Sequence, residues 1–469
     1  MQTLRTFLFL NLIFLSFCVS SQGLQFHGFA ETGLLAGTNG RIPFWMLTNR
    51  FGRFSPKSAN GYIDAGIFSD SIDKKRVTAI DWGLEGFGRY DGGWDGWLQQ
   101  AWAGAKWKKF YFYAGLKEEH FGSQNPEMSS GMVMWSGNAR PLPQISLTTI
   151  DYIDVPFTNR FVQFNAGISH GWFGNNGYVK QAYLHHKYFY LRFGGESRIH
   201  LTIGLQHFAV WGGISPKYGR LPSSLADFFK VFIAYNGHND SIPGVPPNEW
   251  KNRFGDHRGT KDISVDYKFN DNWTTQLYWQ NFIEDIMGLG WRQAIDGLWG
   301  ISFKYKTKLN FCYEYLHSSL NNASFKNAIS QGNFQDILDF KDYFNNSIYL
   351  SGWTYKGYLI GNPMISSPIL LSDPSIAPKI VNNRVNGHIV SSSLTLDKFQ
   401  LFVRFSHTKN FGSLTWAIDP PKFQNGLMIS VSKQRFLFDR IDASISVAMD
   451  AGALYGNHLG FEYKMRWNY

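Results

Sequence analysis

Adjacent acidic and imidazole side chains are the groups in this chain that could carry out chemistry. Glu118-Glu119-His120 and Glu284-Asp285 could serve in hydrolysis or hold a cation, and His185-His186 could bind a metal ion. On a strand or an extended loop, however, neighbouring side chains point in opposite directions. We therefore disfavour a catalytic role for the acidic residues, and we interpret His185-His186 as part of a strand with one ring on each face.

Several catalytic sequence signatures are missing from the chain. It contains no His-Glu-x-x-His motif, no phosphate-binding glycine-rich loop and no helical calcium loop. We expect a protein that is not an enzyme, with no cofactor, no metal and no nucleic-acid partner.

A second set of residues has the types that recognise carbohydrate. Aromatic faces cover the apolar side of a sugar ring, while amides, carboxylates and guanidinium groups bond its hydroxyl and acid groups. Four stretches combine these types: Trp135, Asn138, Arg140 and Gln144; Glu284, Asp285, Trp291, Arg292 and Asp296; Trp211, Tyr218 and Arg220; and Asn362, Arg384 and Asn386. The alternative for each residue is structural, as an interfacial tryptophan or as an arginine paired with an internal carboxylate.

The elements that position these residues show a period of two. At the end of the sequence, apolar or aromatic side chains alternate with Glu462, Lys464, Arg466 and Asn468. The apolar set is Phe461, Tyr463, Met465, Trp467 and Tyr469. A strand that is apolar on one face, polar on the other and aromatic at its end is typical of an outer-membrane β-barrel. We interpret these five residues as the signal read by the barrel-assembly machinery.

The same alternation recurs at 263–269, 273–279, 309–315, 399–405 and 441–449. Aromatic residues make up 17% of the chain and charged residues another 17%, with 47 glycines, which suits half-buried strands joined by turns. We predict an all-β fold: a single antiparallel transmembrane barrel of about 18 strands, with apolar residues outward and polar residues inward.

Connection lengths predict the orientation of the barrel. Very short links are expected at Lys106 to Lys109, Asn270 to Asn272, Thr307-Lys308, Asp397-Lys398 and Asp439-Arg440. Long segments are expected at 36–60, 118–148, 212–259, 284–296, 320–347 and 361–386. The short links would lie in the periplasm and the long loops at the cell surface. Residues Ser224 to Ala234 could form a short helix that acts as a plug or brace inside or beneath the barrel.

The beginning of the chain reads as a secretory signal peptide. Arg5 precedes an apolar run from Phe7 to Val19, and small residues follow at Ser20-Ser21. We assign residues 1–21 to the signal peptide and 22–469 to the barrel. Lipidation at Cys18 is disfavoured because bulky Phe17 precedes it. Beyond the signal peptide Cys312 is the single cysteine, which excludes an intramolecular disulfide and a cysteine metal site.

The charge balance indicates an anionic partner. The chain carries 45 basic and 35 acidic residues, for a formal net charge of +10. On the route to the outer membrane of a Gram-negative cell, such a balance suits lipopolysaccharide phosphate or an acidic polysaccharide. Ordinary loop and turn charge is the alternative explanation.

Four stretches resemble the Wzi-type capsule assembly family, in its divergent Bacteroides-like form. They are Trp135 to Gln144, Asp296 to Gly300, Gly357 to Pro363 and Asn383 to Gly387. The resemblance covers the whole mature chain and rests on loop motifs rather than a catalytic signature. The helical periplasmic bundle of better-known members has no clear counterpart here.

This resemblance implies an outer-membrane lectin with surface-exposed loops that binds capsular or other exported polysaccharide and helps attach it to the cell. We expect a monomer in contact with outer-membrane lipid and lipopolysaccharide. Two alternatives are a passive porin, favoured by the polar inward faces, and an outer-membrane enzyme acting on lipid or glycan.

Overall fold

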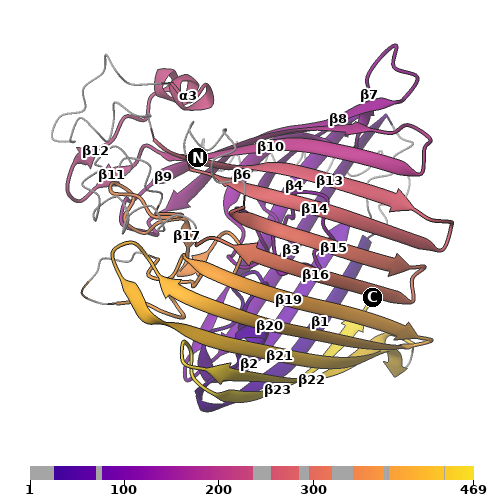
Figure 1. Cartoon of the computed structure of the whole chain (residues 1–469), viewed down its shortest axis with the longest axis vertical. Coiled ribbons are helices and arrows are strands. Elements are labelled where there is room, and N and C mark those ends of the chain that lie inside the picture. Colours follow the sequence, from indigo (N-terminus) through magenta and orange to yellow (C-terminus); the bar gives the residue numbers. More distant parts are fainter. Residues whose placement is uncertain are drawn as a thin grey trace, which may run out of the picture.

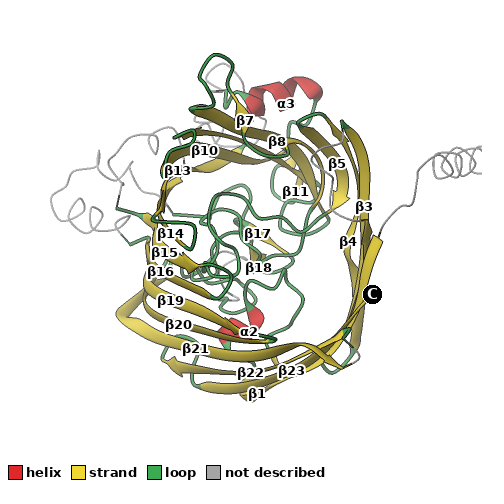
Figure 2. Ribbon diagram, turned by 90° about the vertical axis from the view of Figure 1, so that its right-hand side faces the viewer, coloured by secondary structure: helices red, strands yellow, loops and turns green. Residues whose placement is uncertain are grey.

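A closed antiparallel β-barrel forms the body of the protein. The computed structural model describes residues 26–69, 77–235, 255–284, 295–319, 342–373, 375, 380–437 and 439–469. The main sheet contains 19 strands, of which 18 form the closed ring. Figure 1 shows these strands running side by side across the molecule, and Figure 2 shows the ring.

The ring follows the order of the chain. Its strands are β1 (Phe26–Arg41), β2 (Lys57–Ser69), β3 (Thr78–Tyr90), β4 (Trp94–Trp107), β5 (Phe110–Leu116), β6 (Pro143–Thr149), β8 (Val162–Gly174), β9 (Ala182–Phe193), β10 (Ile199–Trp211), β13 (Asp256–Lys268), β14 (Trp273–Ile283), β15 (Gly297–Tyr305), β16 (Leu309–His317), β19 (Val385–Leu396), β20 (Phe399–Gly412), β21 (Ala417–Leu437), β22 (Ile441–Gly452) and β23 (His458–Asn468). The short β7 (Ile153–Asp154) pairs with β8 alone. Pairing of β1 with β23, from Phe29↔Asn468 to Gly37↔Gly460, closes the ring.

Side chains of the ring alternate as the sequence predicts. On β22 and β23 the apolar residues Ile445, Val447, Phe461 and Tyr463 are exposed on the outer wall, while Glu462 is buried on the inner wall. Closure leaves no open sheet edge, and the apolar outer face suits a bilayer. The prediction of an 18-strand barrel with apolar residues outward is confirmed.

The two ends of the barrel differ in their connections. At one end, which we call the turn end, the hairpins are short, as between β4 and β5, between β15 and β16 and between β19 and β20. The other end, which we call the loop end, carries the long connections 42–56, 117–142, 212–255 and 318–384. It also carries short ones, such as 91–93 between β3 and β4.

One expectation about the loops is wrong. The sequence indicated separate long loops at 320–347 and 361–386, yet both segments belong to the single connection between β16 and β19. These two strands pair directly, from Leu309↔Leu394 to His317↔Asn386, so no barrel strand lies between them. The described residues between the two segments form instead a small hairpin of β17 (Thr354–Tyr355) and β18 (Tyr358–Leu359).

Two helices occur in the described residues. The first, α2 (Phe44–Leu47), lies inside the ring, and the second, α3 (Leu225–Phe232), lies outside it (Figure 2). A two-stranded sheet of β11 (Ile214–Ser215) and β12 (Gly219–Arg220) precedes α3. Neither helix has the length or the apolar character needed to cross a membrane.

Candidate functional site

Packed loops fill the loop-end half of the barrel. Residues 42–56, 117–142, 342–373 and 380–384, which we call the plug, turn inward between the strands (Figure 2). Their apolar side chains form a core with the inner wall, in which Trp45, Val133, Phe344 and Trp353 are buried. Burial of this apolar surface gives the plug a fixed structure of its own.

Wall residues hold the plug through buried hydrogen bonds. The Glu314 carboxylate on β16 accepts bonds from the Ser129 hydroxyl and the Ser130 backbone N–H, each at 2.6 Å. From β20 the Arg404 guanidinium donates to the carbonyl oxygens of Glu127 and Ser129, at 2.8 and 3.1 Å. Charged wall residues therefore fasten the connection between β5 and β6 inside the lumen.

Several residues that the sequence marked as ligand contacts join the plug loops instead. The Asn138 amide donates to the Leu359 carbonyl at 3.0 Å, and the Asn362 amide donates to the Ser130 hydroxyl at 3.0 Å. Trp135 lies 6.1 Å from the Phe208 ring, measured between centroids. All three side chains are buried: the two asparagines link loops that are more than 200 residues apart in the chain, and Trp135 packs against Phe208 of the β10 wall.

Three further candidates, on the barrel wall or at its loop end, make hydrogen bonds within the fold. Gln144 on β6 donates to the Glu119 carboxylate at 2.7 Å. Asp296 accepts from the Tyr343 hydroxyl at 2.8 Å. Glu284 accepts from the Phe344 backbone N–H at 2.7 Å, and burial raises the pKa of its carboxyl to about 7.

The remaining candidates are scattered. Trp211 lies on the outer wall beneath α3 and is buried, and Arg220 is exposed in β12. Arg384 is half-buried and donates to the Phe411 carbonyl at 3.4 Å. Asp285 and Trp291 lie outside the described residues. The structure does not bring the predicted set together in one place.

The adjacent charged residues diverge as expected. Glu118 pairs with Arg53 at 2.7 Å, whereas Glu119 accepts hydrogen bonds from Tyr113 and Gln144. Arg53 also contacts the inner-wall carboxylates of Asp64 and Glu85, so it balances several buried acids in the lumen. Burial and the neighbouring Glu85 raise the pKa of Glu118, and Arg53 opposes this.

His185 and His186 also separate, one to each face of β9. The His185 ring lies against Phe228 of α3 on the outer wall, and the His186 ring stacks on Phe208 inside the lumen at 4.0 Å between centroids. In the described part of the chain, no group of three or more His, Cys, Asp or Glu side chains is arranged to hold a metal ion.

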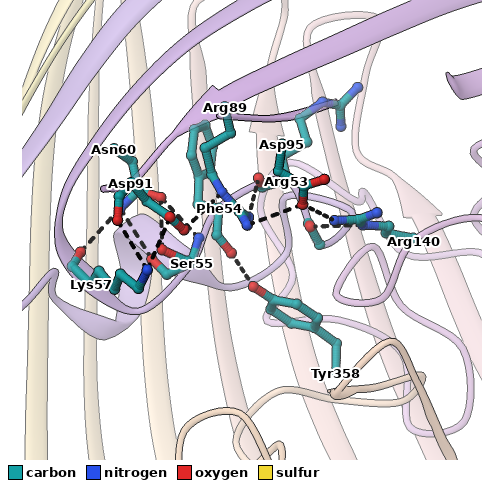
Figure 3. A network of polar contacts seen from close by, with 11 residues as sticks. Arg53, Phe54, Ser55, Lys57, Asn60, Arg89, Asp91, Asp95, Arg140 and Tyr358 are labelled. Carbon is teal, nitrogen blue, oxygen red and sulfur yellow. Dashed lines mark hydrogen bonds and ion pairs between the residues drawn. The ribbon is translucent and has the colours of Figure 1, made fainter. Parts of the chain in front are cut away.

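A different set of charged groups meets at the rim of the loop end. Arg89 and Asp95 come from β3 and β4, Asp91 from the turn between them, Lys57 from the start of β2 and Arg140 from the plug (Figure 3). We call these five residues, with Trp97 of β4, the rim cluster. The cluster reaches solvent through Lys57 and Asp95, whose side chains are 64% and 55% exposed, while those of Arg89, Asp91 and Arg140 are only 12%, 11% and 17% exposed.

The geometry of the rim cluster is set by two stacked cations. The guanidinium carbon of Arg140 lies 3.4 Å from the centroid of the Trp97 ring, and that of Arg89 lies 5.5 Å from it. Arg89 pairs with Asp91 at 3.1 Å and with Asp95 at 3.6 Å, while Arg140 is 4.0 Å from Asp95. The arginines are therefore held by an aromatic face and only partly neutralised.

Electrostatics at the rim favour an added negative charge. Burial lowers the pKa of Arg140, and the neighbouring Arg89 lowers it further. Although burial opposes the change, hydrogen bonds from Ser55 and Lys57 lower the pKa of Asp91. The cluster can thus present guanidinium and ammonium donors together with carboxylate acceptors to one ligand.

A family model for the capsule assembly protein Wzi matches residues 65–367. The chain belongs to the Wzi capsule assembly family. A comparison with curated proteins gives no match.

Solved structures include a Wzi barrel with the same fold. It is described as an outer-membrane protein involved in group 1 capsule assembly in Escherichia coli and as a carbohydrate-binding β-barrel. Identity is 14%, the TM-score is 0.59, and the match covers 93% of this chain and 83% of that one. OpdQ of Pseudomonas aeruginosa (8% identity, TM-score 0.48, 95% and 98% covered) and OccAB2 of Acinetobacter baumannii (10%, 0.46, 95% and 97%) are more distant. The fold and the family identify an outer-membrane barrel with a capsule-related role.

The motifs that resemble the Wzi family largely build the plug. The stretches 135–144 and 357–363 meet there, as the bond between Asn138 and Leu359 shows. In this Wzi-family chain, these two motifs take part in the packing of the long plug loops against one another. A weaker sequence signal marks the rim cluster, namely Arg89-Tyr90-Asp91 and Trp94-Asp95-Gly96-Trp97 on either side of a tight turn. Only Arg140 of the rim cluster was among the predicted ligand residues.

Proposed function

We propose that this protein binds exported capsular or another surface polysaccharide at its rim cluster and helps attach and organise the polymer at the cell surface. The observation that carries the proposal is the group of Arg89, Arg140 and Lys57 around Trp97 and Asp95, which reaches solvent through Lys57 and Asp95. The capsule-related role of the Wzi family supports this function. The carbohydrate binding described for the Escherichia coli barrel is consistent with it.

The loop end faces outward in this proposal. Long loops at one end and short hairpins at the other are the usual arrangement of outer-membrane barrels, with the short hairpins in the periplasm. Residues 1–21 are then a signal peptide and 22–469 the mature barrel, a monomer inserted by the barrel-assembly machinery among lipid and lipopolysaccharide. The rim cluster and the outer surface of the plug meet the polymer.

The chemistry of the rim cluster favours an acidic polymer. Two guanidinium groups and an ammonium group can bond carboxylate groups on sugars, while Asp95 accepts bonds from sugar hydroxyls. Because Trp97 and the fold already hold the arginines in place, less conformational entropy is lost on binding. The proposed role is binding rather than catalysis, since Glu118, Glu119 and Glu284 are engaged inside the fold.

The plug argues against the porin alternative. A passive pore needs an open lumen, whereas packed apolar side chains fill the loop-end half of this barrel. A cavity of about 550 Å³ does occur beneath the plug, beside Asp266, Lys268 and Lys304. It lies in the turn-end half of the lumen.

Polysaccharide retention on cells tests the proposal. A gene deletion is complemented with the wild-type chain, with the double variant Lys57→Met and Arg140→Met, and with Arg160→Met as a matched control at the turn end. We expect polymer to move from the cells to the medium in the deletion and in the double variant, but not with Arg160→Met. If the deletion strain retains as much polysaccharide as the wild type, the proposed attachment function is contradicted. If the deletion strain loses polymer but the double variant retains it at the wild-type level, the rim cluster is not the binding site.

A further inference from the structure

Helix α3 lies on the outside of the barrel wall at the loop end. Figures 1 and 2 both place it beyond the ring of strands, near β8 and β10. Its first turn is closed by a capping box, because the Ser224 hydroxyl accepts from the Asp227 backbone N–H and the Asp227 carboxylate accepts from the Ser224 backbone N–H. This cap stabilises an eight-residue helix in the connection between β10 and β13.

One side of α3 covers imidazole groups on the outer wall. The Phe228 ring lies 5.8 Å from His170 and 5.6 Å from His185, and the Phe232 ring lies 5.5 Å from His185. Along β9, His185 points to the same face as the exposed Phe189, and yet His185 is fully buried. The helix therefore shields polar wall residues that would otherwise face the lipid.

Lys187 fastens the end of α3 to the same wall. Its ammonium group donates to the Phe232 carbonyl and lies 4.2 Å from the centroid of the Phe232 ring. A cation at the C-terminus of a helix is favourable, because the last carbonyl groups carry partial negative charge. The helix is thus held at both its apolar side and its end.

A second side of α3 is apolar and uncovered. Leu225, Phe229 and Ile233 recur every four residues and are 74%, 59% and 66% exposed. With about 3.6 residues per turn, they form a single stripe next to the side that contacts the barrel. Asp227 and Lys230 lie on the third side. The three sides therefore face the barrel wall, an apolar medium and water.

The position of the stripe indicates what the apolar medium is. The outer wall near α3 exposes Phe189, Ile203 and Leu205 on β9 and β10, toward the turn end from the covered histidines. These residues belong to the apolar outer face of the barrel, which contacts lipid in an outer-membrane protein. The uncovered stripe continues this face at its loop-end edge.

We propose that α3 is an interfacial helix that inserts Leu225, Phe229 and Ile233 among the acyl chains of the leaflet at the loop end, with Asp227 and Lys230 toward the headgroups. Helices with an apolar side and a charged side bind membranes in this way. The helix would fix the depth of the barrel in the membrane and keep lipid away from His170 and His185.

Spin labels on the full barrel in phosphatidylcholine vesicles test this inference. Single cysteines replace Leu225, Phe229 or Lys230 in a Cys312→Ser background, with Ile203→Cys as the lipid reference and Asp271→Cys, in a turn-end hairpin, as the water reference. A chain without an introduced cysteine reports any stray label. The measurement is the accessibility of each nitroxide to oxygen, which concentrates in lipid, and to a water-soluble nickel chelate. Heat-modifiable migration on gels confirms that each variant is folded.

We expect the labels at 225 and 229 to match the label at 203, with high oxygen and low nickel accessibility, and the label at 230 to resemble that at 271. Nickel accessibility at 225 and 229 equal to that at 271 would overturn the inference, because the stripe would then face water. Low accessibility to both reagents would also overturn it, since another protein surface or a second copy of the chain would then cover the stripe. Testing two separate positions keeps the result interpretable if one variant does not fold.

Discussion

The guanidinium carbon of Arg140 lies 3.4 Å from the centroid of the Trp97 ring, which joins the plug to the inner wall of the barrel at its rim. The contact connects the loop after β5 to strand β4. Arg140 also lies 4.0 Å from Asp95 and donates to the Gly52 carbonyl at 3.3 Å. A flat guanidinium can stack on an indole and bond a ligand at its edge at the same time.

Arg140 should therefore contribute directly to polymer binding. We expect Arg140→Met to weaken binding of the purified barrel to the cell's own polysaccharide about tenfold, equivalent to about 1.4 kcal/mol. Arg140→Lys should recover little, because an ammonium group offers no planar fork for carboxylates. Titration calorimetry measures both variants, with Arg160→Met as the control. Equal affinity for all four proteins would remove Arg140 from the site.

Removal of a wall contact should loosen the plug. The Glu314 carboxylate holds Ser129 and Ser130 and also accepts from the Tyr278 hydroxyl at 2.7 Å. We expect Glu314→Ala to destabilise the plug by about 1–3 kcal/mol, because several buried donors lose their partner. Conductance in planar bilayers should rise above the wild-type level, while Glu196→Ala in an exposed turn should change nothing. High conductance of the wild type would instead favour the porin alternative.

Glu284 should make stability depend on pH. Burial raises the pKa of its carboxyl from an ordinary value of 4.5 to about 7, against the opposing effect of Arg258. Between these values the folded state binds more protons than the unfolded state, so stability should fall as pH rises from about 4.5 through 7. The full contribution is at most about 3 kcal/mol.

The variant Glu284→Gln removes this titration. We expect urea unfolding in detergent micelles, measured from pH 4.5 to 8.5, to show a flatter profile for Glu284→Gln than for the wild type. The exposed substitution Glu196→Gln is the control and should keep the wild-type slope. Parallel profiles for Glu284→Gln and the wild type would contradict this assignment.

Closure of the ring should depend on its last residues. The Tyr469 backbone N–H donates to the Gly28 carbonyl at 2.9 Å, and its ring stacks on Phe26 with centroids 6.1 Å apart. We expect Tyr469→Asp to lower the amount of assembled barrel in the outer membrane several-fold, because a charge would replace an exposed aromatic ring on the lipid side. Heat-modifiable migration of membrane fractions measures assembly, with Asn468→Asp as the control. Normal assembly of Tyr469→Asp would contradict the proposed role of the terminal strand as an assembly signal.

The sequence by itself determined the class of fold and the direction of most barrel side chains. Alternation of apolar and polar residues is a local property, since successive side chains of a strand always point to opposite faces. It therefore predicted the outer position of Phe461 and Tyr463, the inner position of Glu462, and the separation of His185 from His186. The helix expected within Ser224 to Ala234 was also local, and it appears as Leu225–Phe232 with Ser224 as its cap. Its expected position inside or beneath the barrel was wrong, because its aromatic side packs on the outer wall (Figure 2).

Only the tertiary structure decided what the loops do. An asparagine that bonds a sugar and one that bonds a distant carbonyl have the same chemistry, so the sequence could not distinguish a ligand contact from the bond between Asn138 and Leu359. Conversely, Trp97 and Arg140 belong to different hairpins and meet only because the loop after β5 folds back into the lumen. The barrel follows from a repeating local pattern, whereas the plug and the rim cluster follow from contacts between segments that are remote in the chain.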